Sequence, residues 1–466
     1  MTHTQPSFQG IIGVARCDIT PPAGIYSRNW GAALHDVADG IQRPMTLTCI
    51  TVQAKRDDPP LVLIGADLGW WKSLDDEWFV RGGVLDALSI DAGRCMFCLS
   101  HTHAGPSVNR EDAAKPGGQH CALYLEKLRA ASIRAAQHAL STAVPATLDW
   151  RYGKCDLATN RDLRDPDRDR CIVGFNPAQP ADDTLLLGRI TDEQGRVLGT
   201  IVNYACHPTT LAWDNRLISP DYVGATREVV ETHTHAPCLF LQGASGELAP
   251  AEQYSGDAAL ADSHGRRLGH AALATLEAML PPATQLVFKG AIESGAALAM
   301  WKREPDEASR VLAVEKVEIE LDLKPMPTTA QIKEEWQRTE DRVLKERLWR
   351  KLGVRQIVGD GTTSRKGLWS WRLGDALLFG HPFEAYSVFQ TRLRAKFPSM
   401  PVVVMNIVNS YAGYLPPREL YGLDLYTVTV TPFAAGSLER FTEHALQAGE
   451  RLQALAPHAA PAGTRK

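Results

Sequence analysis

The sequence predicts a mixed α/β fold in which central β-sheets are flanked by helices. Short runs of apolar or β-branched residues, which are typical of buried strands, recur along the chain. Segments with helical periodicity lie between these runs, and this alternation indicates an α/β architecture. Because no internal repeat or long low-complexity linker divides the 466 residues, we expect one domain over residues 1–455 and a flexible tail over residues 456–466.

The strands and helices are predicted from two different patterns. The clearest apolar runs place strands at residues 61–66, 95–99, 198–205, 239–241, 311–323, 377–380 and 402–408. Helical periodicity places helices at residues 123–140, 222–231, 259–280 and 331–352. The last of these is mostly charged, with opposite charges four residues apart, so we expect it to present a solvated face.

Composition excludes several classes of function. Lys and Arg total 50 and Asp and Glu total 54, so a net charge of −4 leaves no basic field for nucleic acid. No apolar run is long enough to predict a transmembrane segment, and no secretion signal is visible. We therefore expect a cytoplasmic protein with reduced cysteines, among them Cys95 and Cys98 as buried strand thiols. The oligomeric state stays open.

Three histidines follow predicted strands at points where a proline ends regular structure. His101 and His103 come directly after residues 95–99, and on an extended backbone they would face the same side. His207 follows residues 198–205 and precedes Pro208. Strand ends commonly carry catalytic side chains in α/β proteins, and paired imidazoles suit a metal site. Histidines satisfied at a surface strand end are the alternative.

Two other segments match chemical motifs only in part. His233 and His235 repeat the spacing of the first pair, but they end a predicted helix, where the helix dipole accounts for them. Ser245 stands at a turn similar to a nucleophile elbow. That elbow needs a glycine two residues after the serine, and this chain has Glu247 there, which argues against a serine triad.

A carboxylate and a group of tyrosines follow later in the chain. Glu384 comes after the predicted strand at residues 377–380, and we expect it to open a helix that runs towards Lys396. Tyr411, Tyr414 and Tyr426 lie beyond it, and clustered tyrosines are more typical of packing than of chemistry.

Six segments in one order resemble the neutral/alkaline non-lysosomal ceramidase family. They are residues 13–20 (GVARCDIT, similar to GxxRxDIT), 66–69, 100–106 (SHTHAGP, close to SHTHSGP), 160–161 (similar to the start of NRS), 382–384 (PFE, similar to PGE) and 410–414 (SYAGY) with Tyr426. The spacing of Tyr414 and Tyr426, twelve residues apart (426 − 414), matches the family's pair of tyrosines.

The resemblance implies a ceramidase-like, zinc-dependent amidohydrolase that acts on an N-acyl amide or sphingolipid-like small molecule. Zinc lowers the pKa of a bound water to about 7, and this water would attack the amide carbon. By motif position, the implied zinc ligands are His101, His207, Glu384 and Tyr414. The groups implied around the scissile carbonyl are His103, Arg161 and Tyr426. There His103 could shuttle the proton to the leaving amine, and Arg161 or Tyr426 could stabilise the oxyanion.

Departures from the family pattern keep alternatives open. Ala249 stands where the family's GDxSP motif has a serine, so covalent serine catalysis at this position is excluded. The C-terminal immunoglobulin-like domain of typical members is not seen, and those members are usually secreted or membrane-associated. A non-catalytic metal-binding pseudoenzyme and a zinc esterase or small-amide hydrolase are the alternatives. Trp70 and Trp71 would line an apolar cleft or pack in the core.

Overall fold

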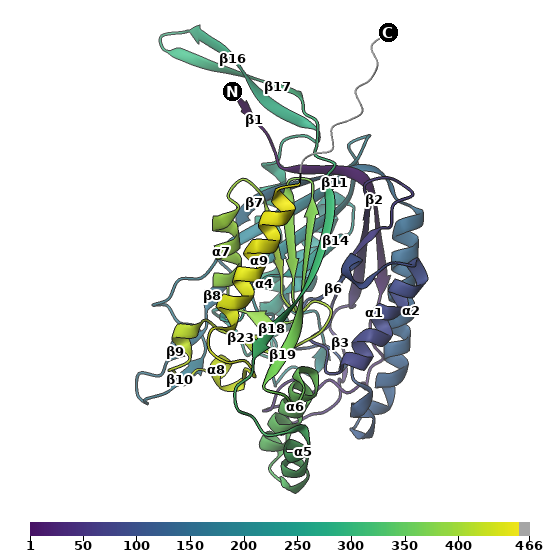
Figure 1. Cartoon of the computed structure of the whole chain (residues 1–466), viewed down its shortest axis with the longest axis vertical. Coiled ribbons are helices and arrows are strands. Elements are labelled where there is room, and N and C mark those ends of the chain that lie inside the picture. Colours follow the sequence, from purple (N-terminus) through teal and green to yellow (C-terminus); the bar gives the residue numbers. More distant parts are fainter. Residues whose placement is uncertain (456–466) are drawn as a thin grey trace.

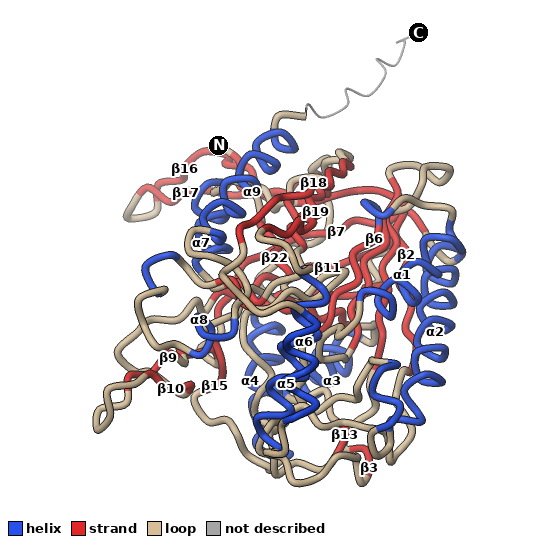
Figure 2. The backbone as a smooth tube through the Cα atoms, turned by 60° about the horizontal axis from the view of Figure 1, so that its bottom comes forward, coloured by secondary structure: helices blue, strands red, loops and turns tan. Residues whose placement is uncertain are grey.

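The protein is built around two main β-sheets that pack face to face, with helices on their outer faces (Figures 1 and 2). This computed structural model describes residues 1–455, so the tail predicted at 456–466 lies outside the described residues. The larger sheet contains, in spatial order, β14 (Cys238–Gln242), β12 (Val197–Tyr204), β11 (Thr184–Asp192), β7 (Val144–Lys154), β2 (Ser7–Asp18), β4 (Thr46–Gln53), β5 (Leu61–Ala66) and β6 (Cys95–Leu99). The smaller sheet contains β18 (Leu312–Asp322), β19 (Thr363–Leu373), β20 (Ala376–Gly380) and β22 (Val402–Met405). The predicted mixed α/β class is confirmed.

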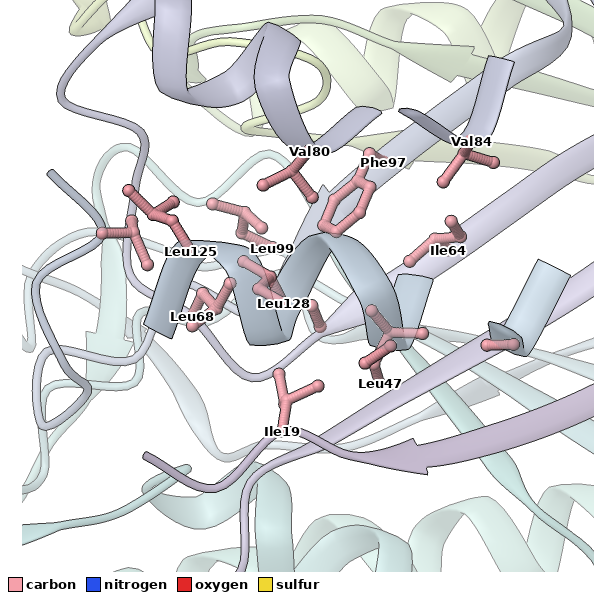
Figure 3. Packing of buried hydrophobic residues seen from close by; sticks show 14 of the residues in the cluster. Ile19, Leu47, Ile64, Leu68, Val80, Val84, Phe97, Leu99, Leu125 and Leu128 are labelled. Carbon is pink, nitrogen blue, oxygen red and sulfur yellow. The ribbon is translucent and has the colours of Figure 1, made fainter. Parts of the chain in front are cut away.

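Each central strand faces two cores, because successive side chains point to opposite faces. On β5, Leu63 joins the core between the two sheets together with Trp371 and Val403. Its neighbour Ile64 points the other way, into a core shared with helix residues such as Leu128 (Figure 3). The sequence of a strand that is buried on both faces is a continuous run of apolar residues. For this reason the predicted strands at 61–66 and 95–99 match β5 and β6 residue for residue.

Three pairs of helices supply the outer cores. The larger sheet is covered by α1 (Leu74–Leu88) and α2 (Cys121–Ser141) over one part and by α3 (Tyr222–Thr234) and α4 (Ala258–Glu277) over the other. The smaller sheet is covered by α7 (Val388–Lys396) and α9 (Ser437–Gln453). None of the helices in residues 1–455 is long and apolar enough to cross a bilayer.

The larger sheet curls so that its two edges approach each other. Gly65 on β5 lies against Leu239 and Phe240 on the edge strand β14. A Cβ at Gly65 would come within 2.9 Å of the Phe240 carbonyl oxygen, so the close approach requires glycine. As a result, the segments that follow β6 and β12 meet, although these strands lie far apart in the order of the sheet.

Two sequence predictions were wrong in detail. Residues 331–352 form two helices, α5 (Thr329–Arg338) and α6 (Arg342–Val358), because the Asp341 side chain accepts a hydrogen bond from the Leu344 N–H and caps a new helix. These helices are also not simply solvated, since Ile332, Leu348 and Leu352 form a small buried core between them. The strand predicted at 402–408 ends at Met405.

The cysteines agree with the sequence prediction. All nine lie within the described residues and are free, and Cys95 and Cys98 are buried on β6. Burial raises the pKa of the Cys95 thiol to about 12, so it stays protonated at neutral pH.

A buried ion pair braces the loop that follows β5. The Asp67 carboxylate accepts two hydrogen bonds from the Arg227 guanidinium on α3, at 2.6 and 2.5 Å, and a third from the Thr46 N–H at 2.8 Å. Both charged side chains are buried. The next residue, Leu68, accepts a hydrogen bond from the backbone N–H of His101. The ion pair therefore supports the segment that holds this histidine.

We expect Arg227→Met to lower the free energy of unfolding by about 3–5 kcal/mol, because it leaves the Asp67 carboxylate buried without its counter-charge. Urea unfolding followed by circular dichroism measures the change. Arg338→Met is the matched control, because Arg338 pairs with Glu334 on the exposed face of α5 and should contribute less than about 1 kcal/mol. Equal effects of the two substitutions would contradict this account of the loop.

Candidate functional site

His101 is held by two backbone carbonyls of the loop after β5. Its N–H donates to Leu68 O at 2.9 Å, and its Nδ1 donates to Gly69 O at 3.2 Å. A carbonyl only accepts, so Nδ1 carries a proton, and in the neutral ring the Nε2 lone pair is then free. The residue has a φ of 69°, in the left-handed region. The expected extended backbone was therefore wrong, although His103 still reaches the same centre, with its Nε2 3.4 Å from His101 Nε2.

His207 is held in the same way from the other side of the curled sheet. Its N–H donates to Leu248 O at 2.8 Å, and its Nδ1 donates to Ser245 O at 2.6 Å. Its Nε2 lies 3.2 Å from His101 Nε2. The ring is completely buried, and this burial lowers the pKa of His207 to about 3, which keeps the imidazole neutral.

Glu384 lies on a short strand rather than on a helix, so the predicted helix start was wrong. β21 (Glu384–Ala385) pairs in parallel with β23 (Tyr414–Leu415), and α7 begins only at Val388. The register sets Glu384 directly beside Tyr414. This pairing joins segments thirty residues apart in sequence, which a local helix signal does not reveal.

The Glu384 carboxylate completes a cluster of three electron-pair donors. Its Oε2 lies 3.1 Å from His101 Nε2 and 2.8 Å from His207 Nε2, and its Oε1 accepts a hydrogen bond from the Tyr411 hydroxyl at 2.7 Å. Burial opposes ionisation of this carboxylate, and a proton on the facing imidazoles would hold its pKa well below its usual range. With both Nε2 atoms unprotonated, a cation has to supply that positive charge.

This donor set fits a metal ion. Both Nδ1 protons are committed to carbonyls, so two nitrogen lone pairs and a carboxylate oxygen face one another without a proton between them. A shared cation relieves that repulsion. Three ligands at about 2.0–2.1 Å from a tetrahedral zinc would lie roughly 3.3–3.4 Å apart. The separations here are 3.2, 3.1 and 2.8 Å, so binding would need the donors to move apart slightly. His103 forms a second possible set with His101 and His207, whose nitrogens lie within 4.8 Å of one another.

Arg161 borders the three donors. It follows β8 (Ala158–Asn160), and its N–H donates to Glu247 O at 2.9 Å. Its Nη2 lies 2.8 Å from Gly246 O, 3.1 Å from the Tyr414 hydroxyl and 3.2 Å from His207 Nε2. Because two Nη2 protons have three acceptors in reach, Arg161 keeps two partners even if a metal takes the lone pair of His207.

The two tyrosines named from the sequence pack against each other beside this arginine. The Tyr414 ring stacks on His207 at a centroid distance of 6.3 Å. Tyr426, the first residue of α8 (Tyr426–Val430), meets Tyr414 edge to face at 5.8 Å and is 45% exposed. The structure thus brings all seven residues named from the sequence into one region.

An aromatic cavity of about 1240 Å³ opens over the cluster. Trp70 and Trp71 both border it, and the Trp70 ring lies 5.1 Å from the His103 ring. Trp71 is also fully buried against Phe97, so it combines the two roles that the sequence left open. Other aromatic residues of the lining, which the sequence did not single out, are Trp30, Trp213, Tyr254 and Trp349. The charged helix α6 forms much of the wall, so its predicted role as a solvated face was incomplete.

Tyr411 has a role that the sequence did not predict. Clustered tyrosines indicated packing, but the Tyr411 hydroxyl donates a hydrogen bond to Glu384 and orients it. Its position three residues before Tyr414, in the segment SYAGY, was the one available signal.

The partial motifs lie elsewhere or play other roles. His233 pairs with Glu277 on the surface at 2.9 Å, and His235 caps the end of α3. Ser245 is buried, and its hydroxyl accepts from Gln242 Nε2, while its carbonyl holds His207. Ala249 is buried on β15 (Leu248–Pro250).

The fold is shared with solved neutral ceramidases. The crystal structure of neutral ceramidase from Pseudomonas aeruginosa superposes with a TM-score of 0.67 and 16% sequence identity, covering 98% of this chain and 77% of that one. A ceramidase complexed with C2 matches with a TM-score of 0.66 at the same identity and coverage. No family model matches the sequence, and no curated protein matches it. The resemblance drawn from the motifs is confirmed at the level of the fold.

We expect Tyr411→Phe to weaken binding of a divalent metal about 10- to 100-fold, because Glu384 loses the hydrogen bond that orients it. Competition against a chromogenic chelator measures the affinity. Tyr421→Phe is the control, since that hydroxyl donates to the Phe433 carbonyl instead. An unchanged affinity in Tyr411→Phe would mean that Glu384 does not ligate the metal.

Proposed function

We propose that this chain is a zinc-dependent hydrolase that cleaves the C–N bond of an N-acyl amide. The observation that carries the proposal is the convergence of His101 Nε2, His207 Nε2 and Glu384 Oε2, each held by a hydrogen bond to its other polar atom. Two imidazoles and a carboxylate form a common zinc ligand set that leaves a position open. The neutral ceramidase fold supports hydrolysis of an amide.

Tyr414 would be the fourth protein group at the metal, because its strand register sets it beside Glu384. When bound, zinc lowers the pKa of water to about 7 and polarises a carbonyl oxygen. Tyr411 would hold Glu384 in place from behind.

Three further residues would act on the substrate itself. His103 Nε2 lies next to the donor cluster and would take the proton of the attacking water and pass it to the leaving nitrogen as the C–N bond breaks. Arg161 Nη2 and the Tyr426 hydroxyl would donate to the carbonyl oxygen as negative charge develops on it.

The cavity supports a substrate with a substantial apolar part. Its volume exceeds that of a typical drug-sized site, and Trp30, Trp70 and Trp213 form apolar surface beside the histidines. An N-acyl chain or a sphingolipid-like molecule would fill this space and exclude water from the reacting amide.

We also propose that residues 1–455 form one domain in the cytoplasm. The core between the sheets joins residues from both halves of the chain, such as Leu63 and Val403. Nine free cysteines suit a reducing compartment.

Release of amine from a panel of N-acyl amides, with matched esters, tests the reaction. We expect turnover of at least one amide, loss of that turnover on chelation and its recovery with zinc. His207→Ala should be inactive, whereas His233→Ala, a surface histidine, should keep full activity. Turnover that survives both the chelator and His207→Ala would refute the zinc mechanism. Hydrolysis of the esters alone would indicate the esterase, and no turnover by a zinc-loaded protein would indicate the pseudoenzyme.

His103 and Glu384 both lie beside His101 and His207, so either could complete the metal site, and substituting each in turn separates their roles. We expect His103→Gln to keep its bound zinc and to lower kcat about 10²- to 10⁴-fold, as for loss of a general acid–base. Glu384→Gln should lose the zinc. The reverse pattern in elemental analysis, with zinc lost from His103→Gln and kept in Glu384→Gln, would assign the site to the three histidines.

A further inference from the structure

A β-hairpin projects from the body at the end of the molecule where the N-terminus lies (Figure 1). It consists of β16 (Thr284–Glu293) and β17 (Ala297–Pro305), and β1 (Thr2–His3) adds two residues to the outer side of β16. Almost every residue of β17 is exposed. A hairpin that protrudes in this way gains little from the cores of the body.

Both faces of this hairpin carry exposed apolar side chains. Ile292, Leu298 and Met300 are 55%, 48% and 37% exposed, and Ile292 pairs directly with Leu298. On the opposite face, Trp301 is 41% exposed and packs on Phe288 at a centroid distance of 5.6 Å. Isolated hairpins are at best marginally stable in water, and clustered apolar exposure of this kind marks an interaction surface.

The outer edge of β17 is open as well. The sheet order is β1-β16-β17, and within residues 1–455 no strand pairs with the far side of β17. A nine-residue edge without a partner presents a row of backbone donors and acceptors that another strand can join. A surface that offers both an edge and two apolar faces is suited to a strand-like partner.

We propose that β17 pairs antiparallel with β17 of a second copy of this chain, forming a symmetric dimer. The sequence of β17 is self-complementary about Ala299. A twofold axis there sets Ala297 of one copy opposite Trp301 of the other, and Leu298 opposite Met300. The five paired residues are all apolar, and the small side chain at the axis allows close approach. The same patch then serves both copies, as a twofold interface requires.

The charges of the hairpin fit this arrangement. Lys302, Arg303 and Glu304 follow the apolar segment, so in this register they extend past the paired residues and stay in water. With Lys289 and Glu293 on β16, the hairpin carries both signs of charge.

A lipid surface is a poorer partner for the hairpin than a second copy of the chain. Peripheral membrane binding normally uses a basic excess beside the apolar residues, which this mixed pattern does not offer. The hairpin also lies at the end of the molecule opposite to α5 and α6, whose residues line the cavity (Figure 1). Docking the hairpin into lipid would turn the cavity away from the membrane.

Light scattering coupled to gel filtration tests the dimer with the full chain. We expect a mass of twice 51.1 kDa for the wild type and of 51.1 kDa for Leu298→Lys/Met300→Lys, with unchanged circular dichroism. Leu34→Lys is the control, because Leu34 is 90% exposed outside the hairpin and should leave the dimer intact. A monomeric wild type at micromolar concentration would overturn the proposal, and so would a dimer that survives the double substitution.

Cross-linking tests the register independently of stability. Ala299→Cys should form a disulfide-linked dimer under mild oxidation, because this position faces itself across the axis. Ala297→Cys and the wild type should not. Cosedimentation with phosphatidylcholine–phosphatidylserine vesicles tests whether the hairpin binds a lipid surface instead. Vesicle binding by a monomeric wild type, lost in Leu298→Lys/Met300→Lys, would assign the hairpin to lipid and refute the dimer.

Discussion

The site depends on two hydrogen bonds, from Nδ1 of His101 to Gly69 O and from Nδ1 of His207 to Ser245 O. Each bond fixes a tautomer and a ring orientation, so both imidazoles must present an Nε2 lone pair. The buried Glu384 carboxylate lies against these two lone pairs. Only a cation bound between the three groups makes their close approach favourable. The chemistry of the site follows from where two backbone carbonyls lie.

These carbonyls are brought together by the curvature of the larger sheet. Gly69 follows β5, and Ser245 follows β14 at the opposite edge. The two edges meet because Gly65 lets β14 pack against β5 without a clash. The ion pair between Asp67 and Arg227 then fixes the loop that carries Gly69. The fold and the site therefore share one geometric requirement.

The sequence predicted the features that a local residue pattern determines. It did not predict the features that arise from pairing between segments far apart in the chain. Strands buried on both faces are continuous apolar runs, so their ends, and with them His101 and His207, could be located. The strand at Glu384 exists only because it pairs with Tyr414, and its own residues suggested a helix start. Charged helix α6 looked like a solvated surface because its cavity-lining role depends on tertiary contacts. The resemblance to ceramidases, rather than periodicity, connected Arg161 and Tyr426 with the histidines.

The most direct test of the central claim is a crystal structure of the zinc-loaded protein with anomalous data collected at the zinc edge. We expect one strong anomalous peak within about 2.0–2.2 Å of His101 Nε2, His207 Nε2 and a Glu384 carboxylate oxygen. No peak at this position in zinc-soaked crystals, or a peak bound by His103 with Glu384 turned away, would contradict it.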